Sequence, residues 1–397
     1  MFMNKSSRSK RKKKVKANER SERKKKTSKA QQRREERSER ARRAKEKKEK
    51  EEDRGTTGGT TGAGVTGGNG GALADTPEPS KYEKKKELPP APTPPTKPTK
   101  PIPWSGEETA KTMAANDFFN LETIKTSFMS LGNWKHSPDE CSKFKANLDK
   151  ARAPDWSIKD VNLVKLTHDP EKFICACKVP VPEFNRTMIV TQVPDVTSPP
   201  SIEDFWRMIF HEEIVSVVVA LMPLECSVTL QQLFPIAVNT FANHGKMFLN
   251  NKKVESTVAM TSYTLEILPD GCSNSSTTTV YHLHNWRQKR GLEQVGDLVT
   301  TIDKIVKANE NTALVSMNGT GRAGTMLTLF TSMLHVNKEK EVKVRDILEK
   351  LRAERSGLVE NLEQFTTVHR AMGLWFTQKS TDGEIQKKVQ ESFPAVQ

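Results

Sequence analysis

Long apolar runs are nearly absent from this chain of 397 residues. The longest largely apolar stretch, Val215–Met222, is far shorter than the ~20 residues that a helix needs to cross a bilayer, so no transmembrane segment is expected. Lysine and arginine dominate the first residues, where a signal peptide would have an apolar core. Hydrophobic residues make up 35% of the sequence, which is low for a chain that is folded throughout. We therefore expect a folded part and an extensive unfolded part.

Cysteine is also scarce. The odd number of cysteines, in a chain that begins with no secretion signal, favours free thiols in a reducing intracellular compartment: Cys141, Cys175, Cys177, Cys226 and Cys272. Cys175 and Cys177 are too closely spaced for a usual zinc pair, and no second Cys or His pair complements them. The sequence predicts no metal site and no cofactor. We expect a cytoplasmic location, with the nucleus as the alternative.

The positive charge is concentrated at one end. Residues 1–54 hold 25 Lys and Arg against 10 Asp and Glu, which equals the formal net charge of +15 of the whole chain. We expect this segment to be a disordered basic tail. Within it, Lys10–Lys16 is typical of a nuclear-import signal or of a contact with nucleic acid or an anionic surface. The alternative is a solvated charge run without a specific partner, helical between Gln31 and Glu52.

Composition divides the rest of the chain. A Gly/Thr-rich stretch over 55–71 and a Pro/Lys-rich stretch over 76–103 cannot bury apolar area, so we expect a flexible linker over 55–105. Residues 106–380 carry the periodic apolar segments of one folded domain, and 381–397 are expected to form a C-terminal tail.

The most informative motif lies late in the chain, between Leu314 and Thr325. The apolar run Thr312–Ser316 predicts a buried strand, the glycines that follow predict a tight loop, and Thr325–Leu334 predicts a helix. Converging backbone N–H groups, a helix N-terminus and the fork of an arginine together bind anions. The sequence therefore predicts an anion-binding loop formed by Ser316, Met317, Asn318, Gly319, Thr320, Gly321 and Arg322.

A dinucleotide-binding loop is the alternative, because Gly319, Gly321 and Gly324 have G-x-G-x-x-G spacing. Such a loop requires a βαβ unit with an acidic ribose ligand about 20 residues downstream. Here the predicted helix is followed by the charged stretch Asn337–Glu341 and the motif lies late in the chain, so the match is weak.

The loop resembles the phosphate loop of the classical protein tyrosine phosphatases, whose signature is His-Cys, five residues, Arg, then Ser or Thr. Thr191-Gln192 followed by Ser201–Met208 is similar to the family's Thr-Gln pair and its Asp-Phe-Trp-Arg-Met segment. Val359–Phe365 resembles the family's late loop, usually Val-Gln-Thr followed by Gln-Tyr. The resemblance covers roughly Asp117 to Thr377. It implies a tyrosine phosphatase-like fold with a twisted mixed sheet flanked by helices, and the strand and helix patterning independently indicates the α/β class.

The resemblance assigns substituted residues to the catalytic positions. The nucleophilic cysteine corresponds to Ser316, and its preceding histidine to Val315. The general acid of the Trp-Pro-Asp loop corresponds to Gln288 in Trp286-Arg287-Gln288. The glutamine that positions water corresponds to Glu360. The substrate-stacking tyrosine corresponds to Ala153, and the hydroxyl after the loop arginine to Ala323.

Other family positions are retained, and these serve loop shape and anion binding. Besides the loop glycines and Arg322, they are Gln364 in the late loop and Glu225, which sits where a family glutamate braces the loop arginine. Arg287 takes the place of the loop proline. One expectation is that Arg287 brings a cation towards the anion-binding loop when the Trp286 loop closes. The alternative is that its side chain faces solvent.

Several independent substitutions favour a natural pseudophosphatase over a single engineered Cys-to-Ser change. The first hypothesis is a domain that binds a phosphotyrosine protein or another protein partner without hydrolysing it. The second is an active phosphatase of unusual mechanism that uses Ser316 or water to dephosphorylate protein tyrosine. The third is an adaptor that binds polyanions through residues 1–54.

Overall fold

The computed structural model describes residues 104–132 and 134–394. The predicted basic tail and nearly all of the predicted linker lie outside these ranges. Eight strands form one mixed sheet in the order β1-β2-β8-β3-β7-β6-β5-β4. The neighbouring pairs β2–β8, β8–β3 and β3–β7 are parallel, and the other neighbouring pairs are antiparallel. The strands are β1 (Ala176–Lys178), β2 (Met188–Gln192), β3 (Ser216–Ala220), β4 (Phe241–His244), β5 (Met247–Ser256), β6 (Met260–Pro269), β7 (Ser276–Leu283) and β8 (Thr312–Ser316).

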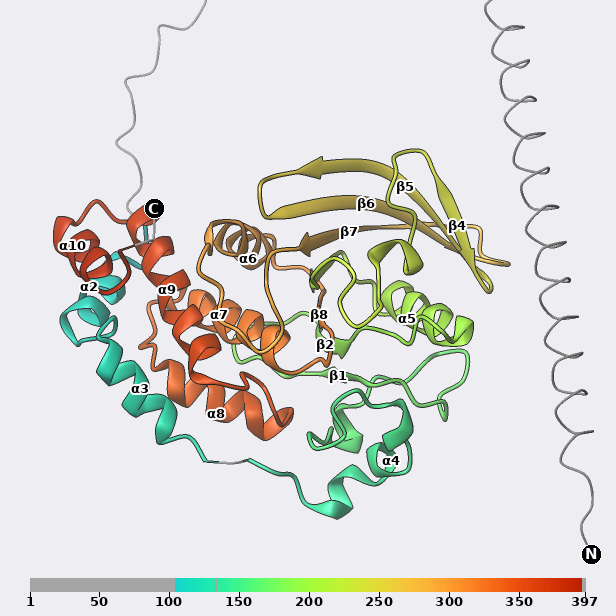
Figure 1. The fold of residues 1–397 in the computed structure, drawn as a ribbon, viewed down its shortest axis with the longest axis horizontal. Coiled ribbons are helices and arrows are strands. Elements are labelled where there is room, and N and C mark those ends of the chain that lie inside the picture. The colour runs from blue at the N-terminus through green and yellow to red at the C-terminus, as the bar shows by residue number, and fades with distance from the viewer. Residues whose placement is uncertain (1–103, 133, 395–397) are drawn as a thin grey trace, which may run out of the picture. The chain divides into compact units, whose positions relative to one another are not determined.

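Helices flank this sheet on both faces, which confirms the predicted fold class (Figure 1). The α-helices are α2 (Glu107–Ala115), α3 (Leu121–Met129), α4 (Ser142–Lys145), α5 (Pro199–His211), α6 (Gly296–Ala308), α7 (Gly321–Asn337), α8 (Val344–Glu354), α9 (Leu362–Lys379) and α10 (Gly383–Ser392). Short 3-10 turns are η1 (Pro138–Cys141), η2 (Leu148–Lys150), η3 (Asp160–Asn162) and η4 (Leu230–Gln232). No helix in the described ranges is long and apolar enough to cross a membrane.

The central strands are buried on both faces because their side chains alternate between two hydrophobic cores. In β8, Leu314 belongs to the core shared with α6, α7 and α9, whereas Ala313 and Val315 belong to the core shared with α5. In α5, Phe205 and Trp206 are both buried, and Trp206 Nε1 donates to the Leu233 carbonyl at 2.8 Å. The two aromatic residues therefore pack α5 against the sheet.

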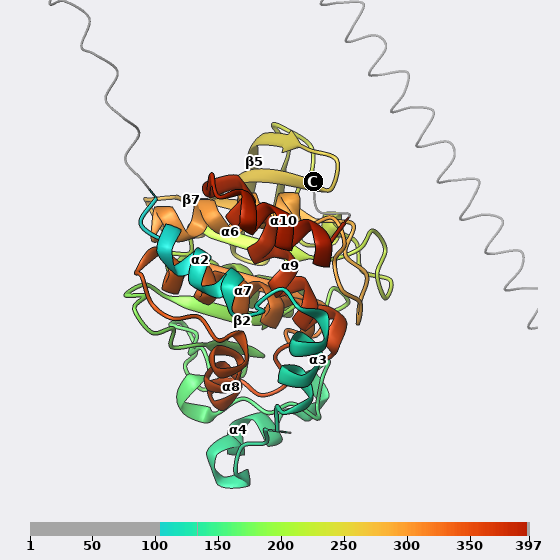
Figure 2. The same ribbon diagram turned by 90° about the vertical axis from the view of Figure 1, so that its left-hand side faces the viewer.

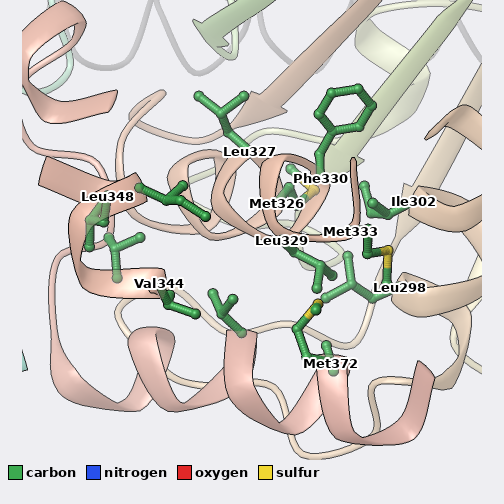
Figure 3. Close-up of a cluster of buried hydrophobic side chains, with 14 of the residues drawn as sticks. Leu298, Ile302, Met326, Leu327, Leu329, Phe330, Met333, Val344, Leu348 and Met372 are labelled. Carbon is green, nitrogen blue, oxygen red and sulfur yellow. The ribbon is translucent and has the colours of Figure 1, made fainter. Parts of the chain in front are cut away.

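Helix α7 is buried almost all round. Figure 3 shows side chains of α6, α8 and α9 gathered about its apolar residues, among them Met326, Phe330 and Met333. Its hydroxyl side chains donate to carbonyls one turn earlier, so they are satisfied inside the core: Thr325, Thr328, Thr331 and Ser332. A helix fixed on every side holds the loop at its N-terminus in one position.

Two domain limits differ from the sequence-based expectation. Residues 381–397, expected as a tail, contain α10, which lies beside α9 and α2 (Figure 2). Ile385, Val389 and Phe393 recur every four residues, so one apolar stripe of the helix and its end is buried. At the other limit, Trp104 belongs to the domain and not to the linker, because its Nε1 donates to Asn337 Oδ1 at 3.0 Å and its ring packs on Trp375.

Candidate functional site

The glycine-rich loop joins β8 to α7 at the carboxyl ends of the parallel strands. Ser316 is the last residue of β8, and its carbonyl accepts from the backbone N–H groups of Val193 and Gly319. Gly319 has φ +62°, and a Cβ there would lie 2.6 Å from the Gln192 nitrogen. Two features therefore require glycine at this position: the positive φ angle and the close approach of β2. The predicted strand Thr312–Ser316 is confirmed.

Helix α7 begins four residues earlier than the predicted Thr325. Its first turn includes Gly324, where a Cβ would lie 2.6 Å from the Val359 nitrogen, and Gly321, where it would lie 2.7 Å from the side chains of Gln364 and Glu360. The glycines are in the helix because of this close contact, and propensity alone did not indicate it. The loop thus leads directly into a helix N-terminus, where unpaired N–H groups and the helix dipole favour an anion.

Arg322 is fixed by a buried ion pair. Its Nη1 donates to Glu225 Oε2 at 2.8 Å and its Nη2 donates to Glu225 Oε1 at 2.5 Å. The two side chains are 2% and 8% exposed, so the pair is well shielded from water. Nη1 also donates to the Trp286 carbonyl at 2.7 Å. The predicted brace between Glu225 and Arg322 is therefore present in the geometry.

Glu225 lies on a turn with unusual backbone angles. Three non-glycine neighbours have left-handed conformations: Leu224 at φ +57°, Cys226 at φ +50° and Ser227 at φ +63°. Such residues are uncommon in this region and persist where surrounding contacts hold them. Here the Glu225 carboxylate supplies two of those contacts, because it accepts from the Met222 backbone N–H at 3.0 Å as well as from Arg322.

The late loop places Glu360 and Gln364 over the start of α7. Thr320 Oγ1 donates to Glu360 Oε1 at 2.6 Å, and the Glu360 backbone N–H donates to Gln364 Oε1 at 2.8 Å. Gln364 is fully buried, and its Nε2 has no hydrogen-bond partner among the described residues. A buried amide donor without a partner is costly, so it marks a place where an acceptor fits.

These elements line a small, partly open cavity of about 10 Å³. That volume holds roughly one water molecule and is too small for a phosphoryl group. The lining residues come from the Trp286 loop, the glycine-rich loop and the late loop: Gln288, Lys289, Ser316, Asn318, Thr320, Gly321, Arg322, Glu360 and Gln364. Trp286 itself is fully buried, and its carbonyl ties this loop to Arg322.

A family model described as "Protein-tyrosine phosphatase" matches residues 147–373, which is more than half of the chain. The chain belongs to the protein-tyrosine phosphatase family. "Putative tyrosine-protein phosphatase C15H7.3" of Caenorhabditis elegans is 61% identical over 295 residues, which cover 74% of each chain. "Tyrosine-protein phosphatase non-receptor type 2" of Rattus norvegicus is 25% identical over 275 residues, or 66% of this chain and 65% of the relative.

Within this phosphatase fold, some predicted site residues do not reach the cavity. The Met317 side chain belongs to the hydrophobic core, and Arg287 is exposed, so the solvent-facing alternative describes Arg287 in this structure. Ala153 also lies outside the cavity lining. It is carried by a segment tied to the end of β2, where the Arg152 backbone N–H donates to Gln192 Oε1 at 2.8 Å.

Two residues of the site, Lys289 and Arg355, are not predicted from the sequence. Lys289 brings a cation to the cavity lining, and the predicted loop residue Thr320 has the unpredicted role of orienting Glu360. Arg355 is fully buried, and its guanidinium donates to the Trp156 carbonyl at 2.8 Å and to the Gly319 carbonyl at 3.4 Å. Burial lowers the pKa of Arg355. No local pattern reveals this residue, because its partners are about 36 and 199 positions away in the chain.

Proposed function

We propose that this phosphatase-family domain acts as a pseudophosphatase, which binds a phosphorylated protein at the Ser316–Arg322 loop in signalling and does not hydrolyse it. The observation that carries the proposal is the chemistry of the cavity lining. Ser316 offers a hydroxyl where the family resemblance places a thiolate, and Gln288 offers an amide that cannot release a proton at useful pH. No hydrogen bond links the Ser316 hydroxyl to a base among the described residues.

Anion binding needs fewer features than catalysis, and the features that it needs are present. The backbone N–H groups of Asn318, Thr320 and Gly321 have no acceptor among the described residues, and they lie at the N-terminus of α7 next to the braced guanidinium of Arg322. A serine in place of a thiolate also removes a negative charge that would repel a phosphate group. The cavity is too small for a phosphoryl group, so a ligand enters only when the residues that line it move apart.

The binding proposal predicts that a tyrosine-phosphorylated peptide binds the full chain and is recovered unhydrolysed. Arg322→Lys keeps a cation opposite Glu225 but loses the fork, so we expect about tenfold weaker binding. Fluorescence anisotropy with the phosphorylated and the unphosphorylated peptide measures the effect, and phosphate release is followed in parallel. Equal affinity for the two peptides would refute phosphate recognition. It would leave a protein partner that ignores phosphate.

A polyanion-binding role is a second candidate, favoured by the location of the entire formal net charge in residues 1–54. We expect the full chain to bind RNA, with an affinity that falls steeply as salt rises, because counterion release drives such binding. Sequence preference should be slight, since the basic cluster has no interleaved aromatic residues.

The control is a chain that begins at residue 95 and so retains Trp104. It should lose RNA binding, as measured by filter binding across a salt series. Undiminished, salt-insensitive binding by the shortened chain would place the RNA contact on the phosphatase domain and contradict the prediction.

A further inference from the structure

The Glu360 carboxylate lies where the phosphatase loop would hold an anion. One oxygen accepts from Thr320 Oγ1 at 2.6 Å, and the other would lie 2.7 Å from a Cβ built on Gly321. Both oxygens are therefore at the N-terminus of α7. Thr320 occupies the N-cap position and makes no side-chain cap bond, and its hydroxyl donates to Glu360.

Spare donors surround this carboxylate. Gln364 Nε2 is buried without a partner, and the backbone N–H groups of Asn318, Thr320 and Gly321 have no acceptor among the residues that the structure describes. Glu360 is the one carboxylate in the lining of the cavity. It is therefore the negative charge that lies nearest to these unpaired donors and to the positive end of the α7 dipole.

The charge balance of the site supports the same reading. The buried positive charge of Arg322 is already matched by Glu225 through two hydrogen bonds. The remaining cation, Lys289, has an exposed side chain. Relative to the family pattern, Ser316 removes the charge of a thiolate and Glu360 adds that of a carboxylate. The negative charge of the site therefore lies on Glu360 in the late loop and not at position 316.

We propose that Glu360 is the resident anion of this loop and makes the site select singly charged over doubly charged phosphoryl ligands. The proposal rests on the proposed binding function, and it implies that a phosphotyrosine peptide, whose phosphate carries a charge of about −1.5 to −2 at pH 7, binds the unmodified chain more weakly than Glu360→Gln. An entering oxyanion shares the α7 N-terminus with the carboxylate or displaces it from Thr320. The repulsion between them is proportional to the charge of the ligand, so a dianion is disfavoured more strongly than a monoanion.

Tungstate and perrhenate test this selection, because they are tetrahedral oxyanions of similar size with two charges and one charge, respectively. Their affinities for the full chain and for Glu360→Gln are measured by isothermal titration calorimetry. The variant should bind tungstate about tenfold more tightly and perrhenate about threefold more tightly, since the energies scale with ligand charge. The matched control is Glu293→Gln, which removes an exposed carboxylate outside the cavity lining. Its affinities should equal those of the unmodified chain.

The outcomes separate the selection from the binding site itself. Equal gains for both anions in Glu360→Gln would show relief of a steric block and overturn selection by charge. Unchanged affinities in Glu360→Gln, combined with weaker binding in Arg322→Lys, would overturn the role of Glu360 and leave the anion loop intact. No binding of either anion to any variant would overturn both this inference and phosphate recognition at the loop.

Discussion

Hydrolysis of p-nitrophenyl phosphate by the full chain is expected to be indistinguishable from the buffer rate. A positioned general acid contributes about 10²–10⁴-fold to such reactions, and Gln288 cannot serve as one. The serine hydroxyl is a weak nucleophile unless a base activates it, and the Ser316 hydroxyl has no such partner in the described cavity lining. Absorbance of released nitrophenolate, followed over hours at high protein concentration, measures the rate.

Three variants sharpen this expectation. Ser316→Ala should change nothing, and Ser316→Cys alone should recover little because Gln288 still cannot protonate the leaving group. Combining Ser316→Cys with Gln288→Asp and Glu360→Gln restores three family residue types and should raise turnover by at least about 10²-fold over Ser316→Cys alone. Robust turnover by the unmodified chain that Ser316→Ala abolishes would show an active phosphatase with a serine nucleophile.

Local patterns predicted the centre of the fold well. The strand Thr312–Ser316 was predicted with its observed bounds because an unbroken apolar run is typical of a parallel strand covered on both faces. The apolar run Val215–Met222 likewise contains β3, although the strand itself is shorter. Flanking residues of such a run belong to loops, and hydrophobicity does not distinguish them from the strand.

Packing contacts between distant segments were less accessible from sequence. Glycines at 321 and 324 indicated a loop, yet they form the first turn of α7, where the segment before α9 and the Gln364 side chain leave little space for a Cβ. The resemblance to the family identified Glu360 as a site residue, but it did not indicate which residue its side chain contacts. Its contact with Thr320 joins residues 40 positions apart and depends on how α7 and α9 pack.

The arginine brace has the largest expected effect on stability. Glu225→Leu leaves the buried guanidinium of Arg322 with the Trp286 carbonyl as its one remaining acceptor among the described residues. Removing one partner of a buried ion pair costs about 3–5 kcal/mol, because the other charge stays buried and uncompensated. The melting temperature should fall by about 5–8 °C for a domain of this size, since the entropy of unfolding is about 2.1 cal/mol/K per residue. Differential scanning calorimetry of the full chain measures the change.

A double-mutant cycle separates the interaction energy of the Glu225–Arg322 pair from the cost of burying each charge. Arg322→Met alone leaves Glu225 without its cation and should cost a similar amount, whereas Glu225→Leu combined with Arg322→Met leaves no unpaired charge in this pair. We therefore expect the double variant to be more stable than either single variant, with a coupling energy of about 3 kcal/mol. Additive losses would show that Glu225 and Arg322 stabilise the domain independently. In that case the left-handed residues around Glu225 would be held by the turn itself, and the position of Arg322 beneath the anion loop would not depend on the carboxylate.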